Sequence, residues 1–354
     1  MKAGILISIL FIACCYLALR LFLGQKKFGA FPTGTRLRRI QASPHWQNGA
    51  FANTVPSPRR AEGVSFARML CKFWFGKKDR LIPESSQSFI RVDIASLDKA
   101  QDTLVWFGHS SFYLLQNGLS ILVDPVFSAN AAPFFFSTKA FPGTMVHSPD
   151  DIPQVDYLLI SHDHWDHLDY KTVTALRGKI GKIVCGLGVG AHLERWGFAG
   201  EDIVEGDWGE ALRLEQGFTV HLRTTRHFSG RTLRADQSLW AGFVLETPGR
   251  RIYYSGDGGY GEHFAQIGRE FGPIDLAILE NGQYDANWKY MHMVPEEVAQ
   301  AAIDLHAKVL FPVHNGKFSI ASHPWDEPYR RIVQASKGKP YKLLTPIIGE
   351  PVFL

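Results

Sequence analysis

The sequence predicts an α/β fold in which strands alternate with helices around a large apolar core. Past residue 100, short apolar runs typical of buried strands alternate with amphipathic stretches such as residues 295–307. Apolar residues make up 45% of the 354 residues, enough for one large domain or two small ones. The chain shows no repeat with a period of 20–50 residues, which argues against a repeat protein.

The expected elements follow one another at short spacing. Asn117-Gly118 lies between two apolar runs and predicts a hairpin with a type I′ turn. A helix is expected from Pro295, because proline suits the first turn and the acidic residues after it complement the helix dipole. Further strands are expected at residues 155–160, 218–222, 251–254 and 308–310.

The densest chemical motif directly follows a strand-like run. Residues 161–169 read Ser-His-Asp-His-Trp-Asp-His-Leu-Asp. His162 and His164 can converge on one ion, while Asp166 and His167 can turn towards a second. Neutral imidazole suits zinc, and a carboxylate lends charge to an ion whose bound water must be ionised. The sequence therefore predicts a metal site at the end of this strand.

The spacing His-x-His-x-Asp-His resembles that of the metallo-β-lactamase superfamily, whose fold is an αββα sandwich. In that superfamily two later histidines complete the two metal sites, and a later aspartate bridges them. His227, Asp257 and His314 match these residues in order, each after a strand-like run and close to glycine. The resemblance thus implies two divalent ions. Zinc is favoured because nitrogen ligands dominate, with Mn²⁺ or Fe²⁺ as alternatives.

The same resemblance implies a role for each matching residue. The first metal would take His162, His164 and His227, the second Asp166, His167 and His314, and Asp257 would bridge them. Asp166 would also orient the attacking hydroxide. Asp163 and Asp169 are expected to shape the loop or support the ligands rather than bind metal.

Finer motifs resemble the branch that contains the N-acyl-phosphatidylethanolamine-hydrolysing phospholipases D. They lie at residues 43–53, 106–112, 119–125, 256–260 and 271–277, and the resemblance runs from about residue 40 to the C-terminus. It implies that His292 binds the phosphate or protonates the leaving oxygen; a structural histidine is the alternative. Asp124 would accept a hydrogen bond from a ligand imidazole. Residues 279–288 depart from that branch, which leaves the lipid open.

The N-terminus begins with an apolar segment. Residues 3–19 carry no charge, and residues 21–23 extend the run past Arg20, which is long enough to span a bilayer core. We expect residues 1–25 to be an uncleaved anchor; a signal peptide, a lipoprotein signal through Cys14 and a buried helix are the alternatives. The excess of Lys and Arg after the run places the catalytic domain on the cytoplasmic side.

Two parts of opposite charge follow the anchor. Residues 26–91 form a basic extension with 13 Lys and Arg against three acidic residues, a net charge of +10. Removing this and the +2 of residues 1–25 from the total of +4 leaves −8 for the hydrolase domain, residues 92–354. We expect the extension to contact anionic headgroups, at on the order of 1 kcal/mol per Lys or Arg near the surface. A merely solvated extension is the alternative.

The sequence gives little support for further partners or for a cysteine site. Nucleic acid is not expected, because no binding motif accompanies the charge. Residues 73–78 interleave aromatic rings with lysines, as interfacial segments do, although core packing would give the same pattern. The four cysteines lack the spacing of a disulfide framework or a cysteine-zinc site. A homodimer is compatible with the sequence.

Three functions remain open. The favoured one is a membrane-attached phosphodiesterase that cleaves (N-acyl) phosphatidylethanolamine-like glycerophospholipids with a hydroxide held between two metals. The second is a lactonase or related hydrolase of a small soluble, phosphorylated substrate, since the sister L-ascorbate-6-phosphate lactonases share much of the metal pattern. The third is a non-catalytic binding scaffold, against which the complete ligand set argues. The anchor and the basic extension favour the lipid.

Overall fold

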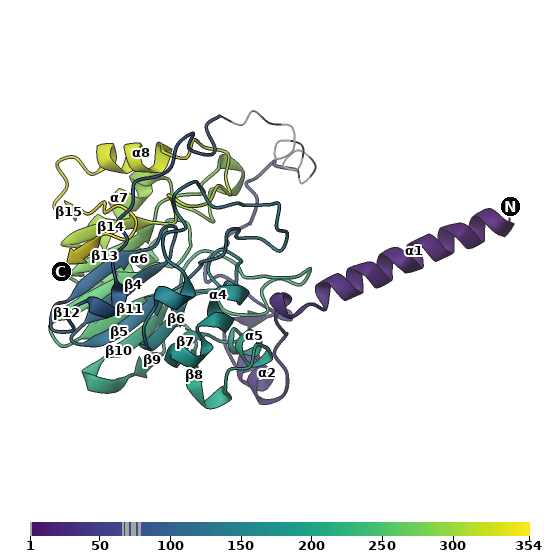
Figure 1. Cartoon of the computed structure of the whole chain (residues 1–354), viewed down its shortest axis with the longest axis horizontal. Helices are drawn as coiled ribbons and strands as arrows, with labels where there is room; N and C mark the ends of the chain where they lie inside the picture. Colours follow the sequence, from purple (N-terminus) through teal and green to yellow (C-terminus); the bar gives the residue numbers. More distant parts are fainter. Residues whose placement is uncertain (1, 66, 68–70, 72–75, 77–78) are drawn as a thin grey trace.

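Two seven-stranded mixed sheets form the centre of the computed structural model, which describes residues 2–65, 67, 71, 76 and 79–354 (Figure 1). The first sheet has the order β16-β3-β4-β5-β6-β7-β8, with β5 to β8 parallel and the other neighbours antiparallel. Its strands are β3 (Thr103–Trp106), β4 (Phe112–Gln116), β5 (Leu119–Val123), β6 (Val155–Ile160), β7 (Ile180–Gly186), β8 (Ile203–Gly206) and β16 (Pro351–Phe353).

The second sheet has the order β15-β14-β13-β12-β11-β10-β9, with β12 to β15 parallel and the others antiparallel. Its strands are β9 (Ala211–Arg213), β10 (Thr219–Arg223), β11 (Gly242–Thr247), β12 (Arg250–Tyr254), β13 (Leu276–Glu280), β14 (Val309–Val313) and β15 (Lys342–Leu343). Alternate residues of both sheets meet between them in one apolar core, which includes Phe112, Ile121, Leu222, Phe243 and Ile278.

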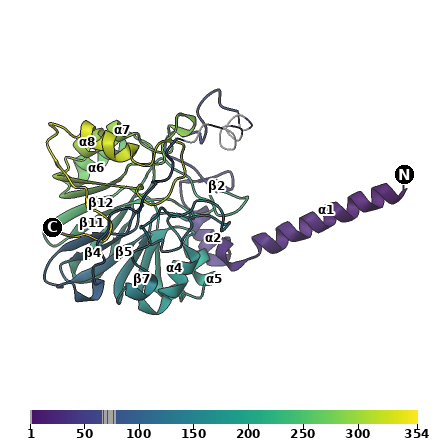
Figure 2. The ribbon, with the colours of Figure 1, turned by 45° about the horizontal axis from the view of Figure 1, so that its top comes forward.

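Helices cover the two outer faces. On the first sheet, α4 (Tyr170–Ala175) and α5 (Gly190–Arg195) pack into a second apolar cluster, and α6 (His263–Phe271), α7 (Pro295–Asp304) and α8 (Glu327–Ala335) pack into a third on the second sheet. The order of layers is therefore αββα. Figure 2 shows the same layers after a 45° turn. Short 3₁₀ turns lie at Lys26–Phe28, Ile94–Ser96, Pro149–Asp151, Arg177–Lys179, Gly200–Asp202, Glu215–Gly217 and Ala286–Trp288.

The local predictions agree with these elements except at one boundary. The expected strands are present, and Asn117 and Gly118 have φ of 48° and 82° between paired Gln116 and Leu119, as a type I′ turn requires. The helix α7 begins at Pro295 as predicted but ends at Asp304, before residue 307. His306 has a left-handed φ of 51°, which a continuing helix does not allow.

The N-terminal apolar run forms the helix α1 (Lys2–Leu23), which projects away from the sandwich (Figure 1). Its stretch Ile5–Leu23 is long and apolar enough to cross a membrane, and none of it is buried. The length and position fit a signal sequence or an anchor. The extension continues through α2 (Gly34–Gln41) and a small hairpin of β1 (Trp46–Gln47) and β2 (Ala50–Phe51). Of the aromatic and basic segment at 73–78, all but Gly76 lies outside the described residues.

Among the described residues, five arginines of the extension pair with acidic residues of residues 92–354. The pairs are Arg36 with Glu194 and Glu205, Arg39 with Glu210, Arg59 with Asp236, Arg80 with Asp326 and Arg91 with Asp151. Such pairs contribute little stability where they are exposed. They do place the extension along the domain of opposite charge, so part of its positive charge is neutralised within the chain.

One lysine is buried in the domain and has a consequence for stability. Lys317 is 1% exposed, and its Nζ donates to the carbonyl oxygens of Phe107 (3.1 Å) and Val126 (2.8 Å). Burial lowers the pKa of Lys317 to about 7. An unfolded lysine titrates at about 10.4, so between these values the unfolded state binds a proton that the folded state does not. Stability should therefore rise with pH across this range.

We expect Lys317→Met to remove this contribution. The free energy of unfolding of the wild type should gain up to about 1.4 kcal/mol per pH unit, relative to the variant, between pH 7 and 10. Denaturant titration of both proteins in detergent at several pH values measures the difference. Parallel curves for the two proteins would show that Lys317 stays protonated in the folded state.

Candidate metal centre

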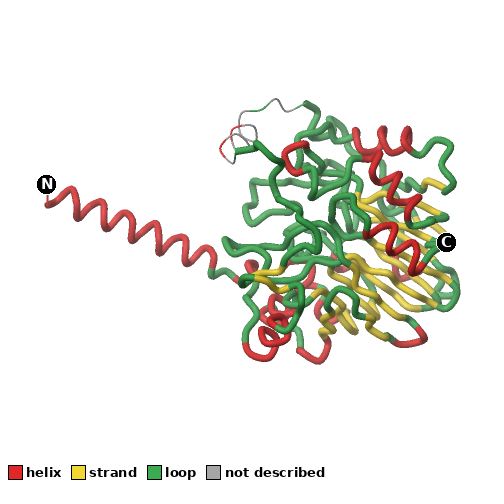
Figure 3. Tube along the Cα trace, turned by 180° about the vertical axis from the view of Figure 1, so that it is seen from behind, coloured by secondary structure: helices red, strands yellow, loops and turns green. Residues whose placement is uncertain are grey.

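The predicted site residues lie in loops at one edge of the sandwich. In the first sheet β3, β5 and β6 run in the same direction, and in the second β10, β12, β13 and β14 do so. Their carboxyl ends therefore share an edge, where open α/β sheets place their ligands. His162 follows β6, His227 follows β10, Asp257 follows β12 and His314 follows β14. Figure 3 shows loops gathered towards α1 and most strands in the far half of the body.

Three histidines form a first cluster. His162 Nε2 lies 3.0 Å from His164 Nδ1, which lies 3.2 Å from His227 Nε2. All three ligand atoms lie within 4.8 Å of one another. Neutral imidazole nitrogens that face one another repel unless a proton or a cation lies between them. The three are suited to binding one ion.

A second cluster adjoins the first. Asp166, His167, His314 and His109 offer ligand atoms that also lie within 4.8 Å of one another. All four residues are buried. The residues predicted for each metal are thus brought together in two adjoining groups, with His109 as an addition, and His162 and His167 of the two groups also lie together beside Asp257.

Asp257 lies between the two clusters. Its Oδ2 lies 3.1 Å from His167 Nε2 and 3.9 Å from His162 Nε2, and its Oδ1 lies 3.2 Å from His314 Nδ1. A carboxylate that reaches both groups is placed as a bridge requires.

Hydrogen bonds behind the clusters orient the imidazoles. The carboxylate of Asp124, buried at the end of β5, accepts from His167 Nδ1 (2.7 Å), from the Tyr254 hydroxyl (2.6 Å) and from the Ser161 backbone N–H (2.8 Å). His227 Nδ1 donates to the carbonyl oxygen of Met291 at 3.2 Å. The contacts of His167 and His227 each occupy Nδ1 and leave Nε2 facing the clusters, as hydrogen bonds behind metal ligands do.

Burial and the neighbouring charges set the protonation of these groups. Burial lowers the pKa of His162, His227 and His314 well below the ordinary value, and nearby histidines add to the effect. Burial alone would also lower the pKa of His167, but the carboxylates around it, first that of Asp257, raise it well above the usual value. The pKa of Asp257 is lowered well below its usual range, because the histidines outweigh its burial. The carboxylate is therefore ionised.

The donor set fits divalent metal ions. Among the described residues, Asp257 Oδ1 and His314 Nε2 are buried atoms with no hydrogen-bond partner, at the point where the clusters meet. Buried polar atoms are rarely left unpaired, so an unpaired carboxylate oxygen and imidazole nitrogen indicate a missing ligand. Nitrogen with carboxylate oxygen suits zinc, iron and related ions.

His292 lies outside both clusters, although one of its ring nitrogens lies within 4.8 Å of ligand atoms of His227 and Asp257. Its ring stacks on His314 at 5.2 Å, and its Nδ1 lies 3.6 Å from Glu280 Oε2. Burial raises the pKa of Glu280 to about 7. Burial would lower the pKa of His292, but Glu280 and then Asp257 outweigh it and raise that pKa. The position, just ahead of α7, brings a protonatable imidazole to the edge of the site.

Two contributors received no role from sequence reasoning. His109 donates from Nε2 to Asp166 Oδ2 (3.0 Å), and its backbone pairs with His314 and Asn315. The sequence pattern that could have identified His109 is the one that the other site histidines share, namely a histidine shortly after a strand-like run. Glu280 is fully buried, and its Oε1 accepts from the Met293 N–H. A glutamate that ends an apolar strand was the sequence signal for it.

The two remaining aspartates of the motif make loop contacts. Asp163 accepts from His192 Nε2 (3.2 Å) and from the Gly230 N–H (2.6 Å). Asp169 caps the helix α4 by accepting from the N–H groups of Lys171 and Thr172. These are contacts that shape a loop.

Comparison with known proteins identifies the family. The family model described as the beta-lactamase superfamily domain matches residues 120–315. An uncharacterized protein of Mycobacterium tuberculosis is 35% identical over 325 residues, which cover 88% of this chain and 85% of that protein. A protein of Klebsiella pneumoniae named outer membrane protein RomA is 62% identical over 99 residues, 28% of this chain and 75% of that sequence.

A relative of known name and a solved structure extend the comparison. The mitochondrial N-acyl-phosphatidylethanolamine-hydrolyzing phospholipase D of Saccharomyces cerevisiae is 32% identical over 240 residues, 64% of this chain and 50% of that protein. An isothiocyanate hydrolase from Delia radicum gut bacteria has the same fold, with a TM-score of 0.58 at 18% identity over 71% of this chain and 98% of that one.

Proposed function

Because this chain belongs to the beta-lactamase superfamily and carries its buried His and Asp site, we propose that it is a membrane-attached phosphodiesterase of phospholipase D type. Its substrates in this proposal are (N-acyl) phosphatidylethanolamine-like glycerophospholipids. The main support is that the chain directly after α1 packs against the metal motif itself. Phe28, just after α1, makes an edge-to-face contact at 5.2 Å with Trp165, which lies between His164 and Asp166. Similarity to the yeast phospholipase adds support.

The proposal assigns the metal ligands as the clusters group them. One ion would be held by His162, His164 and His227, the other by Asp166, His167 and His314, and Asp257 would be shared. Two divalent ions, zinc by preference, would supply Lewis acidity to the phosphate oxygens and lower the pKa of a bound water. This ligand assignment would be the same for any lipid substrate, because it rests on the buried His and Asp residues alone.

The protein's own groups then position the reactants. Asp166, whose Oδ2 is held by His109, can accept a hydrogen bond from the attacking water and orient it. Asp124 keeps the imidazole of His167 in one orientation. His292 can donate a proton to the leaving oxygen or hold a phosphate oxygen, since it lies just ahead of the N-terminus of α7.

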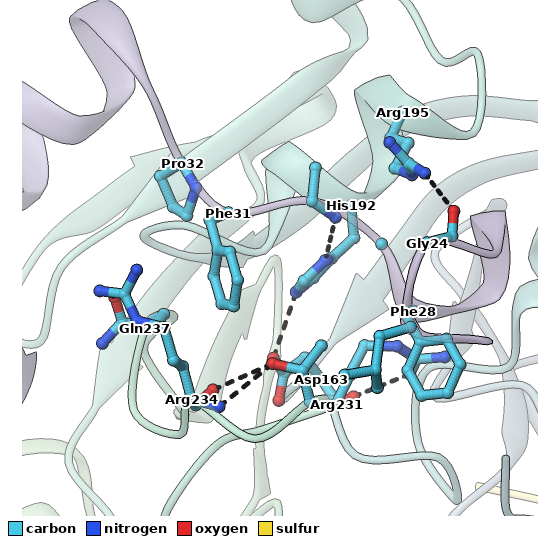
Figure 4. Close-up of a pocket in the computed structure, with 14 residues that line it drawn as sticks. Gly24, Phe28, Phe31, Pro32, Asp163, His192, Arg195, Arg231, Arg234 and Gln237 are labelled. Atoms are coloured by element: carbon cyan, nitrogen blue, oxygen red, sulfur yellow. Dashed lines mark hydrogen bonds and ion pairs between the residues drawn. The ribbon is translucent and has the colours of Figure 1, made fainter. Parts of the chain in front are cut away.

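The proposal includes α1 as an uncleaved anchor with the catalytic domain on the cytoplasmic side. The chain that follows the helix is bound tightly to the domain (Figure 4). Arg195 donates to the Gly24 carbonyl (2.8 Å), Arg231 to that of Lys27 (2.9 Å), and the Ala30 N–H donates to His192 Nδ1 (3.1 Å). The relative named as an outer membrane protein also supports a membrane location.

Deleting residues 1–25 tests the membrane part of the proposal. The cut removes α1 and leaves Phe28, which is buried in the domain. We expect the truncated protein to leave the membrane fraction and to lose activity on vesicles, because the substrate is no longer concentrated around it. Activity on a soluble short-chain phosphodiester should stay nearly intact, since every proposed ligand lies beyond the deletion.

The same assay separates the competing functions. A truncated or full-length enzyme that hydrolyses a lactone well and no phosphodiester in any form would replace the lipid proposal with a lactonase. A protein that binds these compounds and turns over none would be a scaffold.

A further inference from the structure

Three consecutive aromatic side chains project from the loop between β5 and β6. Phe134, Phe135 and Phe136, which we call the aromatic ridge, are 44%, 82% and 63% exposed. Phe134 stacks on Phe136 with ring centroids 5.4 Å apart, and Phe135 meets Phe136 edge to face at 5.4 Å. Contiguous apolar surface of this kind is costly in water and marks a protein or membrane contact.

The ridge is continuous with the apolar surface of α1. Phe22, in the last turn of α1, stacks on Phe134 at 5.2 Å with an interplanar angle of 10°. Lys27 Nζ donates to the carbonyl oxygen of Pro133 at 2.7 Å, which fixes the loop to the chain that leaves the helix. The ridge therefore lies where the helix meets the domain, and a bilayer that surrounds α1 would end beside it.

Cations and the metal motif lie next to the ridge. A cavity of about 280 Å³ separates the aromatic ridge from Trp165 and is also lined by Lys27, Lys171 and Tyr170. Burial and the neighbouring Lys171 lower the pKa of Lys27, as expected for two cations close together. Aromatic rings next to lysines are typical of the interface between headgroups and acyl chains.

We propose that the aromatic ridge inserts into the bilayer beside α1 and holds the face of the domain that carries Trp165 of the metal motif against the lipid surface. This inference rests on the proposed membrane attachment and extends it to a second contact. The lipid acyl region covers the three rings, and phosphate groups pair with Lys27 and Lys171. Two contacts, unlike a single helix, fix the rotation of the domain relative to the membrane.

Photo-crosslinking of the full chain in vesicles tests the inference. p-Benzoylphenylalanine is placed at position 135 or 136, and the protein is reconstituted in phosphatidylcholine and phosphatidylglycerol vesicles. The control carries the same group at Phe353, which is 67% exposed and directly precedes the C-terminal residue. Figure 1 shows the C-terminus on the opposite side of the body from α1. Mass spectrometry after irradiation should find lipid adducts at the ridge positions and none at the control.

Three results of the crosslinking would each overturn the inference. They are adducts with another protein or a second copy of this chain, equal yields of lipid adduct at positions 135 and 353, and no lipid adduct at either ridge position. A triple variant, Phe134→Ser with Phe135→Ser and Phe136→Ser, supplies a second readout. Its KM for vesicle lipid should rise while turnover of a soluble diester stays unchanged, and an unchanged KM would also count against the ridge. If the wild type cleaves no diester, the proposed function fails, but the crosslinking result still decides the inference.

Discussion

Asp257→Ala is expected to lose both bound metal and activity. The Asp257 carboxylate reaches histidines of both clusters, and its removal takes away the shared ligand and the negative charge that the clusters surround. Loss of a partner that only supports a ligand typically costs about 10–100-fold in metal affinity or activity. Loss of the bridge should cost more. Elemental analysis should find about two transition ions per chain in the wild type, most of them zinc, and clearly fewer in the variant.

A matched control separates this effect from a general loss of stability. Asp275→Ala removes a partly buried carboxylate, which pairs with Lys308 at 2.7 Å near the start of β13, away from the strand ends that carry the site. It should keep its metal and its turnover. Active wild-type enzyme without bound metal, or an Asp257→Ala variant with a full complement of metal, would show that the ligands are misassigned.

Strand ends explain why so much of the site could be predicted. A short apolar run followed by His or Asp is visible in the sequence, and parallel strands bring such positions to one edge whatever their separation along the chain. His167, after β6, and His314, after β14, meet for this reason. The family resemblance then assigned the residues to two groups, which neither composition nor spacing alone could have done.

Contacts between distant segments could not be predicted in this way. The role of His109 depends on its contact with Asp166, and that of Glu280 on the arrival of His292 from a loop. The charge count predicted that the basic extension contacts anionic headgroups, which stays a prediction. It could not predict that Arg36 pairs with Glu205 of the oppositely charged hydrolase domain.

His292→Ala is expected to keep both ions and to lower turnover by about 10²–10⁴-fold if His292 is the general acid. Its imidazole lies within 4.8 Å of ligand atoms of His227 and Asp257 but is not one of the proposed ligands, which all remain without it. His221→Ala is a matched control, since His221 lies on β10 and pairs with Glu246 instead. The substrate's leaving group distinguishes the two proposed roles. A nitrophenolate departs without a proton and should restore most of the turnover if His292 is an acid, whereas a phosphate-binding role would appear as a raised KM for every substrate.

Glu280→Gln then tests how His292 is held in place. The change keeps the shape of the side chain and removes the charge that lies 3.6 Å from His292 Nδ1. If Glu280 acts only through His292, Glu280→Gln should lower turnover less than His292→Ala does, by on the order of 10–100-fold as for other supporting partners. The effect should depend on the leaving group in the same way. In the His292→Ala background, Glu280→Gln should cost little more, because residues that act as one unit are not additive. Additive losses would mean that Glu280 supports the site by another route, and loss of metal in either single variant would place His292 among the ligands.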